Sequence, residues 1–218
     1  MINQIFILNS QGIDPSVNSQ SHWKLPYFIE NHITGQKVFI PAIAVCESWL
    51  KPHISNAQIT IPNYQIIRAD RKKRDRGGAL LYIHDDLPVS NEVTYDDHYC
   101  QAAMCTINTS NTVIVCVYRP PNTPEEDTRK VLNFINSYIE DASVKHHMDI
   151  IVVGDINLHC IQWNDLTVRN DGHARSAQAL LSFMADNMLS QYVSAPTRNN
   201  SILDLFLTNN CNLPLHVS

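Results

Sequence analysis

Residues 150–157 read Ile-Ile-Val-Val-Gly-Asp-Ile-Asn, an apolar run that stops at a glycine and is followed by two polar side chains. Four consecutive β-branched residues favour a strand, and the lack of polar alternation favours a strand that is buried on both faces. Ligands of α/β sheets bind just beyond the carboxyl ends of such strands. The segment therefore predicts a central strand whose end, at Asp155 and Asn157, belongs to a functional site.

The composition is that of one soluble globular domain. With 218 residues the chain can bury one substantial core, and no segment marks a boundary, so we expect a single domain over residues 1–218. No apolar run approaches the ~18 residues of a membrane span, and we expect no membrane contact. The start lacks the features of a signal peptide, and the six cysteines form no Cys-x-x-Cys pair, which favours a reduced, intracellular protein.

Apolar runs and helical periods alternate along the chain. A capping box at residues 123–126 predicts a helix that runs to about Ala142, and a second helical period covers residues 174–188. A helix at residues 22–32 is also considered, although Pro26 opposes it. This alternation predicts an α/β fold with sheets covered by helices. The expected strands are residues 5–8, 38–46, 65–69, 79–83, 102–107, 112–118, 149–153 and 202–207.

Several of these runs end in a polar residue with catalytic potential, namely Asn9, Glu47, Tyr118 and Asp155. Each residue taken alone is more often a solvated loop residue or a helix cap. Together, carboxylate, amide and phenol groups suit Mg²⁺ or Mn²⁺ acting on a phosphate ester. The sequence contains neither a P-loop nor a dinucleotide-binding fingerprint, so metal-assisted phosphoryl chemistry is the reading that the residues themselves favour.

Six segments occur in order along the chain: LNSQG at 8–12, CESWL at 46–50, RGGA at 76–79, VYRPP at 117–121, GDIN at 154–157, and PTR at 196–198 leading into SILDL at 201–205. Together they resemble the endonuclease/exonuclease/phosphatase superfamily, and within it the apurinic-like endonuclease domain of non-LTR (LINE-type) retrotransposons. The resemblance implies a four-layered α/β sandwich, in which two packed sheets are flanked by helices as in DNase I. It also implies Mg²⁺- or Mn²⁺-dependent nicking of double-stranded DNA, with a reverse transcriptase domain downstream.

The resemblance implies a role for each matching residue. Glu47 resembles a metal ligand, with Asn9 beside it. Asp155 resembles the residue that positions or deprotonates the attacking water, or protonates the leaving group. Asn157 resembles a residue that holds the phosphate, and Tyr118 resembles a phenol that contacts the phosphate or the leaving oxygen. Together these groups would hydrolyse a DNA phosphodiester by in-line attack of water.

The end of the sequence departs from the family pattern. Asp204 resembles the aspartate that orients a catalytic histidine, but the family's Ser-Asp-His element does not follow before Ser218. His216 comes too soon after Asp204 to be that histidine. The sequence therefore resembles a domain truncated before its last motif, and loss of a general acid or base lowers the rate by about 10²–10⁴. We expect weak nicking or none; the alternatives are an inactive fragment that only binds nucleic acid, or a phosphatase or repair nuclease of the superfamily.

A cluster of basic residues precedes Gly77-Gly78. A run of charge is usually a solvated turn, and contact with DNA phosphates is the alternative. The resemblance favours DNA contact, although the formal net charge of −5 disfavours binding by bulk charge alone. A DNA target also places the protein in the nucleus. The predicted DNA contacts are Arg71, Lys72, Lys73, Arg74 and Arg76.

Overall fold

The computed structural model describes residues 5–9, 39–72, 76–143 and 148–212, with residues 5–9 described by their backbone only. The helix considered at residues 22–32, together with Lys73 and Arg74, lies outside these ranges. Within them, no helix is long and apolar enough to cross a membrane.

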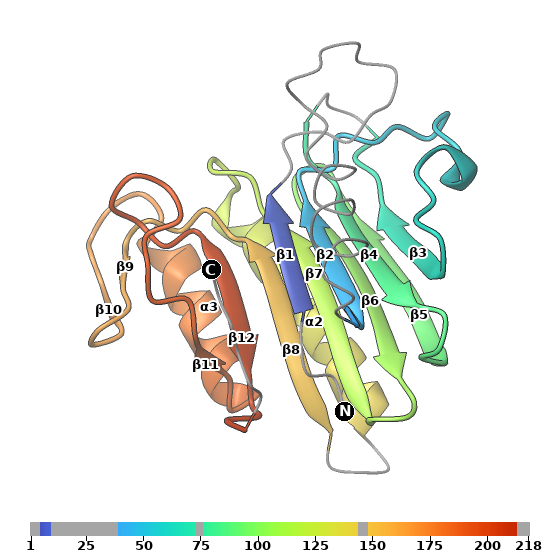
Figure 1. Ribbon diagram of the computed structural model, residues 1–218. Coiled ribbons are helices and arrows are strands. Elements are labelled where there is room, and N and C mark those ends of the chain that lie inside the picture. The colour runs from blue at the N-terminus through green and yellow to red at the C-terminus, as the bar shows by residue number, and fades with distance from the viewer. Residues whose placement is uncertain (1–4, 10–38, 73–75, 144–147, 213–218) are drawn as a thin grey trace.

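Two β-sheets form the centre of the molecule (Figure 1). The smaller sheet has the strand order β1 (Ile5–Asn9), β2 (Ala42–Cys46), β4 (Ala79–His84) and β3 (Tyr64–Ala69). The larger sheet has the order β11 (Ser190–Gln191), β12 (Asp204–Thr208), β8 (Asp149–Asp155), β7 (Thr112–Tyr118), β6 (Gln101–Ile107) and β5 (Val89–Asp96). A short hairpin of β9 (Ile161–Gln162) and β10 (Thr167–Val168) follows β8.

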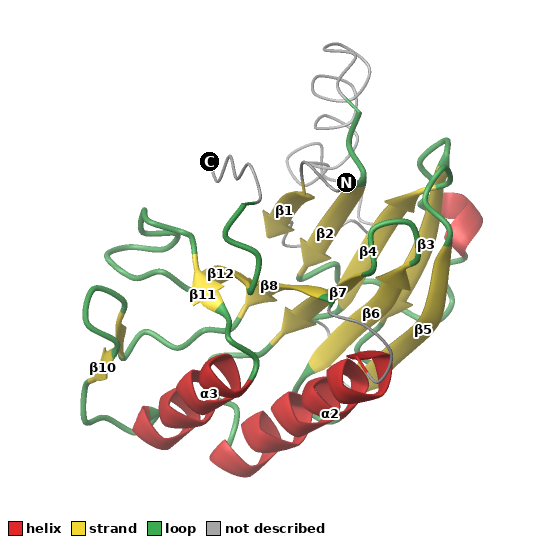
Figure 2. Ribbon diagram, turned by 90° about the horizontal axis from the view of Figure 1, so that it is seen from below, coloured by secondary structure: helices red, strands yellow, loops and turns green. Residues whose placement is uncertain are grey.

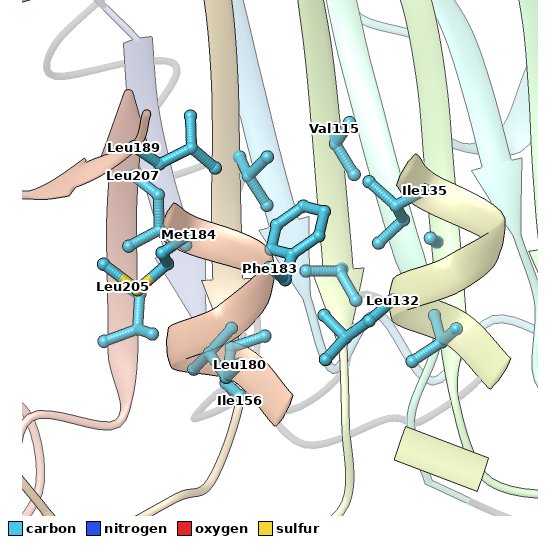
Figure 3. Packing of buried hydrophobic residues seen from close by; sticks show 14 of the residues in the cluster. Val115, Leu132, Ile135, Ile156, Leu180, Phe183, Met184, Leu189, Leu205 and Leu207 are labelled. Carbon is cyan, nitrogen blue, oxygen red and sulfur yellow. The ribbon is translucent and has the colours of Figure 1, made fainter. Parts of the chain in front are cut away.

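Two helices cover the outer face of the larger sheet. Helices α2 (Glu125–Ser143) and α3 (Ala174–Asp186) lie side by side on that face (Figure 2). Figure 3 shows their apolar side chains meeting the sheet, and burial of each such side chain contributes about 1.5–3 kcal/mol. The contact is made by Leu132 and Ile135 of α2, Leu180, Phe183 and Met184 of α3, and Val115, Leu205 and Leu207 of the sheet.

The inner faces of the two sheets pack on each other through small and β-branched residues. Cys46 of β2 and Cys116 of β7 meet there with their sulfur atoms 3.7 Å apart. Both are free thiols, as are the other four cysteines. On the outer face of the smaller sheet, Leu50, Ile54 and Ile61 pack against β2 and β4. The α/β sandwich predicted from the sequence is therefore confirmed.

The structure changes several of the expected element boundaries; β2, for example, begins at Ala42 instead of residue 38. Strand β8 extends two residues beyond residues 149–153, to Asp155. Strand β12 begins at Asp204, because the amides of Leu203 and Asp204 donate to the Thr197 hydroxyl instead of extending the strand backwards. Strand β5 was not predicted. It lies at the edge of the larger sheet and is partly exposed, so its sequence VSNEVTYD lacks the apolar run of a buried strand.

Candidate active site

Strands β7 and β8 run parallel and end side by side at the edge of the larger sheet. Their register pairs Val117 with Gly154 and Tyr118 with Asp155. The amide of Arg119 then donates to the Asp155 carbonyl at 2.9 Å, which extends the pairing one residue past the strand ends. Gly154 has φ +148° and lies directly against the backbone of Val117. The two predicted site residues at these strand ends are therefore held next to each other by backbone pairing.

Asp155 and Asn157 form a small local unit beyond β8. The Asp155 side chain is 0% exposed, and its Oδ1 accepts a hydrogen bond from the Asn157 amide at 3.1 Å. Asn157 adopts the left-handed conformation with φ 51°, which asparagine tolerates better than most residues. Its side-chain nitrogen donates to the Arg119 carbonyl at 3.0 Å. These bonds fix the carboxylate and the carboxamide in one arrangement.

Glu47 reaches the same place from the smaller sheet. Strand β2 ends at Cys46, and Glu47 turns away from it with φ 55°. The Tyr118 hydroxyl donates to Glu47 Oε1 at 2.8 Å, which joins the end of β7 to the end of β2. The amide of Trp49 donates to the Gly77 carbonyl at 2.9 Å and so holds the turn after Glu47. The two sheets thus contribute to one candidate site at the same edge of the sandwich.

Asp204 enters the site from the other side of β8. It is the first residue of β12 and pairs with Asp155 in the antiparallel register. The Thr197 hydroxyl accepts hydrogen bonds from the amides of Leu203 and Asp204 at 3.0 and 3.1 Å. The turn before β12 is therefore tied to the strand start, which sets the position of Asp204 beside Asp155.

The surroundings of Asp155 raise the proton affinity of its carboxylate. Burial, together with the negative charges of Asp204 and Glu47, raises the pKa of Asp155 to about 7, while the Arg198 guanidinium opposes them. Burial also raises the pKa of Tyr118 above its ordinary value, with the Glu47 charge acting in the same direction. Near neutral pH, Asp155 can therefore gain or lose a proton, whereas the Tyr118 phenol stays protonated.

Arg198 is a site residue to which the sequence reasoning gave no role. Its Nη2 lies 3.7 Å from Asp155 Oδ2, and its Nη1 donates to Asn157 Oδ1 at 3.4 Å. Its side chain is 40% exposed. The signal was present in the sequence, because Arg198 belongs to the Pro-Thr-Arg segment that carried part of the resemblance. Only the turn that bridges Arg198 to Ser201 brings it to Asp155.

The metal-site prediction rests on Glu47 and Asn9. Asn9 pairs with Cys46 through the backbone, one residue before Glu47, and its side chain lies outside the described part of the structure. Among the residues whose side chains are described, no group of three or more His, Cys, Asp or Glu is placed to hold a metal ion. One carboxylate and one carboxamide fit Mg²⁺ or Mn²⁺ in kind, and substrate oxygens and water would complete the shell.

The predicted DNA-contacting residues occupy different environments. Arg71 is 5% exposed and points inward, where its guanidinium donates to the carbonyls of Arg76 and His98. The Lys72 side chain is 70% exposed and its amine lies 3.6 Å from Asp96. The Arg76 guanidinium stacks over the Trp49 ring at 5.3 Å from its centroid. Lys72 and Arg76 can thus face a ligand, whereas Arg71 has a structural position that the sequence did not reveal.

Comparisons with solved structures show the fold family. An AP endonuclease from Archaeoglobus fulgidus is 13% identical, with a TM-score of 0.61 over 94% of this chain and 86% of that one. A mannosyl-6-phosphatase from Bacteroides thetaiotaomicron is 10% identical, with a TM-score of 0.61 over 94% and 84%. The endonuclease domain of TRAS1, a telomere-specific non-LTR retrotransposon, is 17% identical, with a TM-score of 0.56 over 93% and 82%.

The sequence itself matches one family. No curated protein sequence matches the chain significantly. A family model described as endonuclease-reverse transcriptase matches residues 112–217, which include Tyr118, Asp155, Asn157 and Asp204. The recognition made from the sequence motifs is therefore confirmed: the chain has the endonuclease/exonuclease/phosphatase fold, and its second half matches the endonuclease-reverse transcriptase family.

Proposed function

We propose that this protein is a metal-dependent endonuclease domain that hydrolyses a phosphodiester bond and so nicks target DNA for a non-LTR retrotransposon. The observation that carries the proposal is the buried Asp155 carboxylate at the end of β8. Asp155 accepts a hydrogen bond from Asn157 and pairs in the strand register with Tyr118, whose hydroxyl donates to Glu47. The match to the endonuclease-reverse transcriptase family supports DNA as the substrate and a reverse transcriptase as the partner domain. We also propose a nuclear location, where that DNA lies.

The chemistry follows from the protonation states of the site. With a pKa of about 7, Asp155 can take the proton of a water molecule that attacks phosphorus in line with the leaving oxygen. The Tyr118 phenol, kept protonated by burial, donates to Glu47 in the structure and would turn its one O–H to a phosphate oxygen when Glu47 holds a cation. Glu47, with Asn9 beside it, would hold Mg²⁺ or Mn²⁺, which supplies neutralisation of charge on the phosphate. The bond from phosphorus to the leaving oxygen breaks as the bond to water forms.

A phosphatase or repair nuclease with the same site is the second candidate. Its support is the similarity of the fold to a phosphatase and to an AP endonuclease, both with a TM-score of 0.61. The substrate separates the candidates, because a nuclease of the proposed kind cuts supercoiled plasmid, whereas a phosphatase releases inorganic phosphate from a monoester.

Glu47→Gln tests the proposed metal role. We expect the rate of plasmid nicking with Mg²⁺ or Mn²⁺ to fall by about 10² or more, because a carboxamide neutralises less charge than a carboxylate. The measurement is single-turnover nicking over long incubation, together with titration of Mn²⁺ into the protein. Glu126→Gln is the control, since Glu126 on α2 is exposed and paired only with Lys130 among the described ion pairs. Equal cutting in EDTA, or an unchanged rate for Glu47→Gln, would contradict the proposal.

The 218-residue polypeptide contains no Ser-Asp-His element, and we propose that it nicks slowly when assayed by itself. Added imidazole at tens of millimolar is expected to raise the rate, because it supplies the missing acid or base, which contributes about 10²–10⁴ when held in place. MOPS at the same concentration and pH is the control for general buffer effects, because its pKa is close to that of imidazole but it has no imidazole ring. Rapid nicking without imidazole would show that this polypeptide needs no histidine.

A further inference from the structure

The candidate site combines three carboxylates with a substrate that is itself an anion. Asp155 is buried, it pairs with Asp204 in the strand register, and Tyr118, its partner on the other side, donates to Glu47. A DNA phosphate placed against these carboxylates is repelled unless nearby cations offset their charge. On the Glu47 side of Asp155, the proposed metal ion would supply this positive charge. The opposite side, toward β12, holds the guanidinium of Arg198.

The position of Arg198 is defined by two contacts. Its Nη2 lies 3.7 Å from Asp155 Oδ2 and its Nη1 lies 3.4 Å from Asn157 Oδ1. Both contacts are long for charge-assisted hydrogen bonds, which are typically about 2.7–2.9 Å. The Arg198 side chain is also 40% exposed, so it is accessible to solvent and to a ligand. The guanidinium therefore stands at the site without being saturated by its present contacts.

Arg198 differs in this respect from the other arginine near the strand ends. Arg119 is 1% exposed, and its guanidinium donates to Thr128 and to the carbonyls of Ile156 and Thr123. Its charge lies beneath the site and is directed into the fold. Arg198 is the partly exposed guanidinium at the Asp155–Asn157 edge within the described structure.

We infer that Arg198 binds a non-bridging oxygen of the scissile phosphate, on the side of Asp155 opposite to Glu47. The inference rests on the proposed function and adds a substrate-binding residue to it. The register supports the placement: Tyr118 and Glu47 lie on the β7 side of Asp155, whereas the turn that carries Arg198 leads into β12 on the other side. A planar guanidinium donates two parallel hydrogen bonds to phosphate, a geometry that a lysine amine does not offer.

The test is equilibrium binding of a fluorescent DNA duplex, measured by anisotropy at several salt concentrations with Ca²⁺ in place of Mg²⁺. Arg198→Gln is expected to weaken binding about 10-fold or more and to lower the slope of log affinity against log salt by about one. Arg198→Lys should keep the slope but recover only part of the affinity. Arg129→Gln is the matched control, because Arg129 is a half-exposed arginine that also pairs with a carboxylate, on α2, and it should leave both quantities unchanged.

A purely structural role for Arg198, as the counter-ion of Asp155, predicts a different result. In that case the effect of Arg198→Gln disappears when Asp155→Asn has already removed the carboxylate. If Arg198 binds phosphate, the 10-fold loss persists in the double variant. Wild-type binding together with equal binding by Arg198→Gln would overturn the inference alone. Failure of the wild-type protein to bind the duplex would overturn the proposed function, and the inference with it.

Discussion

Asp155→Asn is expected to lower the rate of nicking by about 10²–10⁴ and, at the same time, to make the metal-free protein more stable at pH 8. Asparagine has nearly the shape of aspartate and keeps an oxygen that can accept the hydrogen bond from the Asn157 amide. It cannot take a proton from water. It also carries no charge, so it removes the repulsion between Asp155 and its acidic neighbours Asp204 and Glu47.

The stability effect has a definite dependence on pH. The pKa of Asp155 in the folded protein is about 7, against an ordinary value of 3.8. The folded state thus holds a proton that the unfolded chain releases, and this stabilisation is complete below pH 4 and is lost as the pH rises through 7. The full difference corresponds to roughly 4 kcal/mol as an upper estimate. Asp155→Asn removes this dependence, so its advantage over wild type should be larger at pH 8 than at pH 5.

Thermal unfolding in EDTA at pH 5 and pH 8 measures the effect. We expect the midpoint of Asp155→Asn to exceed that of wild type by several degrees more at pH 8 than at pH 5, since 1 kcal/mol shifts a domain of this size by about 2–4 °C. Asp141→Asn is the control, because Asp141 is exposed on α2 and its replacement should change neither midpoint nor nicking. A lower midpoint for Asp155→Asn at pH 8, or nicking at the wild-type rate, would show that the carboxylate has another role.

The sequence predicted the elements that bury a continuous apolar run or one apolar face of a helix. Residues 112–118 coincide with β7, and the helix expected from residues 123–126 to Ala142 corresponds to α2. Such segments are governed by local periodicity, which is visible in one sequence. Strand β5 has no such pattern, because its sequence mixes polar and apolar residues. Its place in the sheet is set by its hydrogen bonds to β6. Its identity depends on the partner strand more than on its own composition.

The sequence offered a set of candidate residues for the site but not their arrangement in space. Glu47 and Tyr118 are 71 positions apart in the chain. They touch because the two sheets that carry them pack on each other. Arg71 and Lys72 are neighbours of the same charge, yet one is buried and the other exposed, because only Arg71 meets the carbonyls of Arg76 and His98. Arg198 belongs to a segment that the resemblance identified, but only the turn that bridges it to Ser201 brings it to Asp155. These facts are set by tertiary contacts.

Gly154→Ala is expected to destabilise the protein by about 3–5 kcal/mol, or to prevent folding. Gly154 has φ +148°, a conformation that residues with a Cβ rarely adopt, and holding one there costs about 1–3 kcal/mol. A Cβ at this position would also lie 1.8 Å from the carbonyl oxygen of Val117. That oxygen is backbone in the neighbouring strand, so the clash cannot be relieved by rotation of a side chain. Overpacking of this kind adds about 1–3 kcal/mol.

Urea unfolding, followed by circular dichroism, compares Gly154→Ala with Gly172→Ala. A Cβ on Gly172 would meet no atom within 4 Å, and the residue is exposed, so its replacement should change the free energy of unfolding by less than about 1 kcal/mol. If Gly154→Ala folds at low temperature, β8 must have moved away from β7, which separates Asp155 from Tyr118 in the register. Nicking should then stay far below wild type even where the variant is fully folded. An unfolding midpoint equal to that of Gly172→Ala would mean that β7 and β8 do not need this close approach, and that the site does not depend on it.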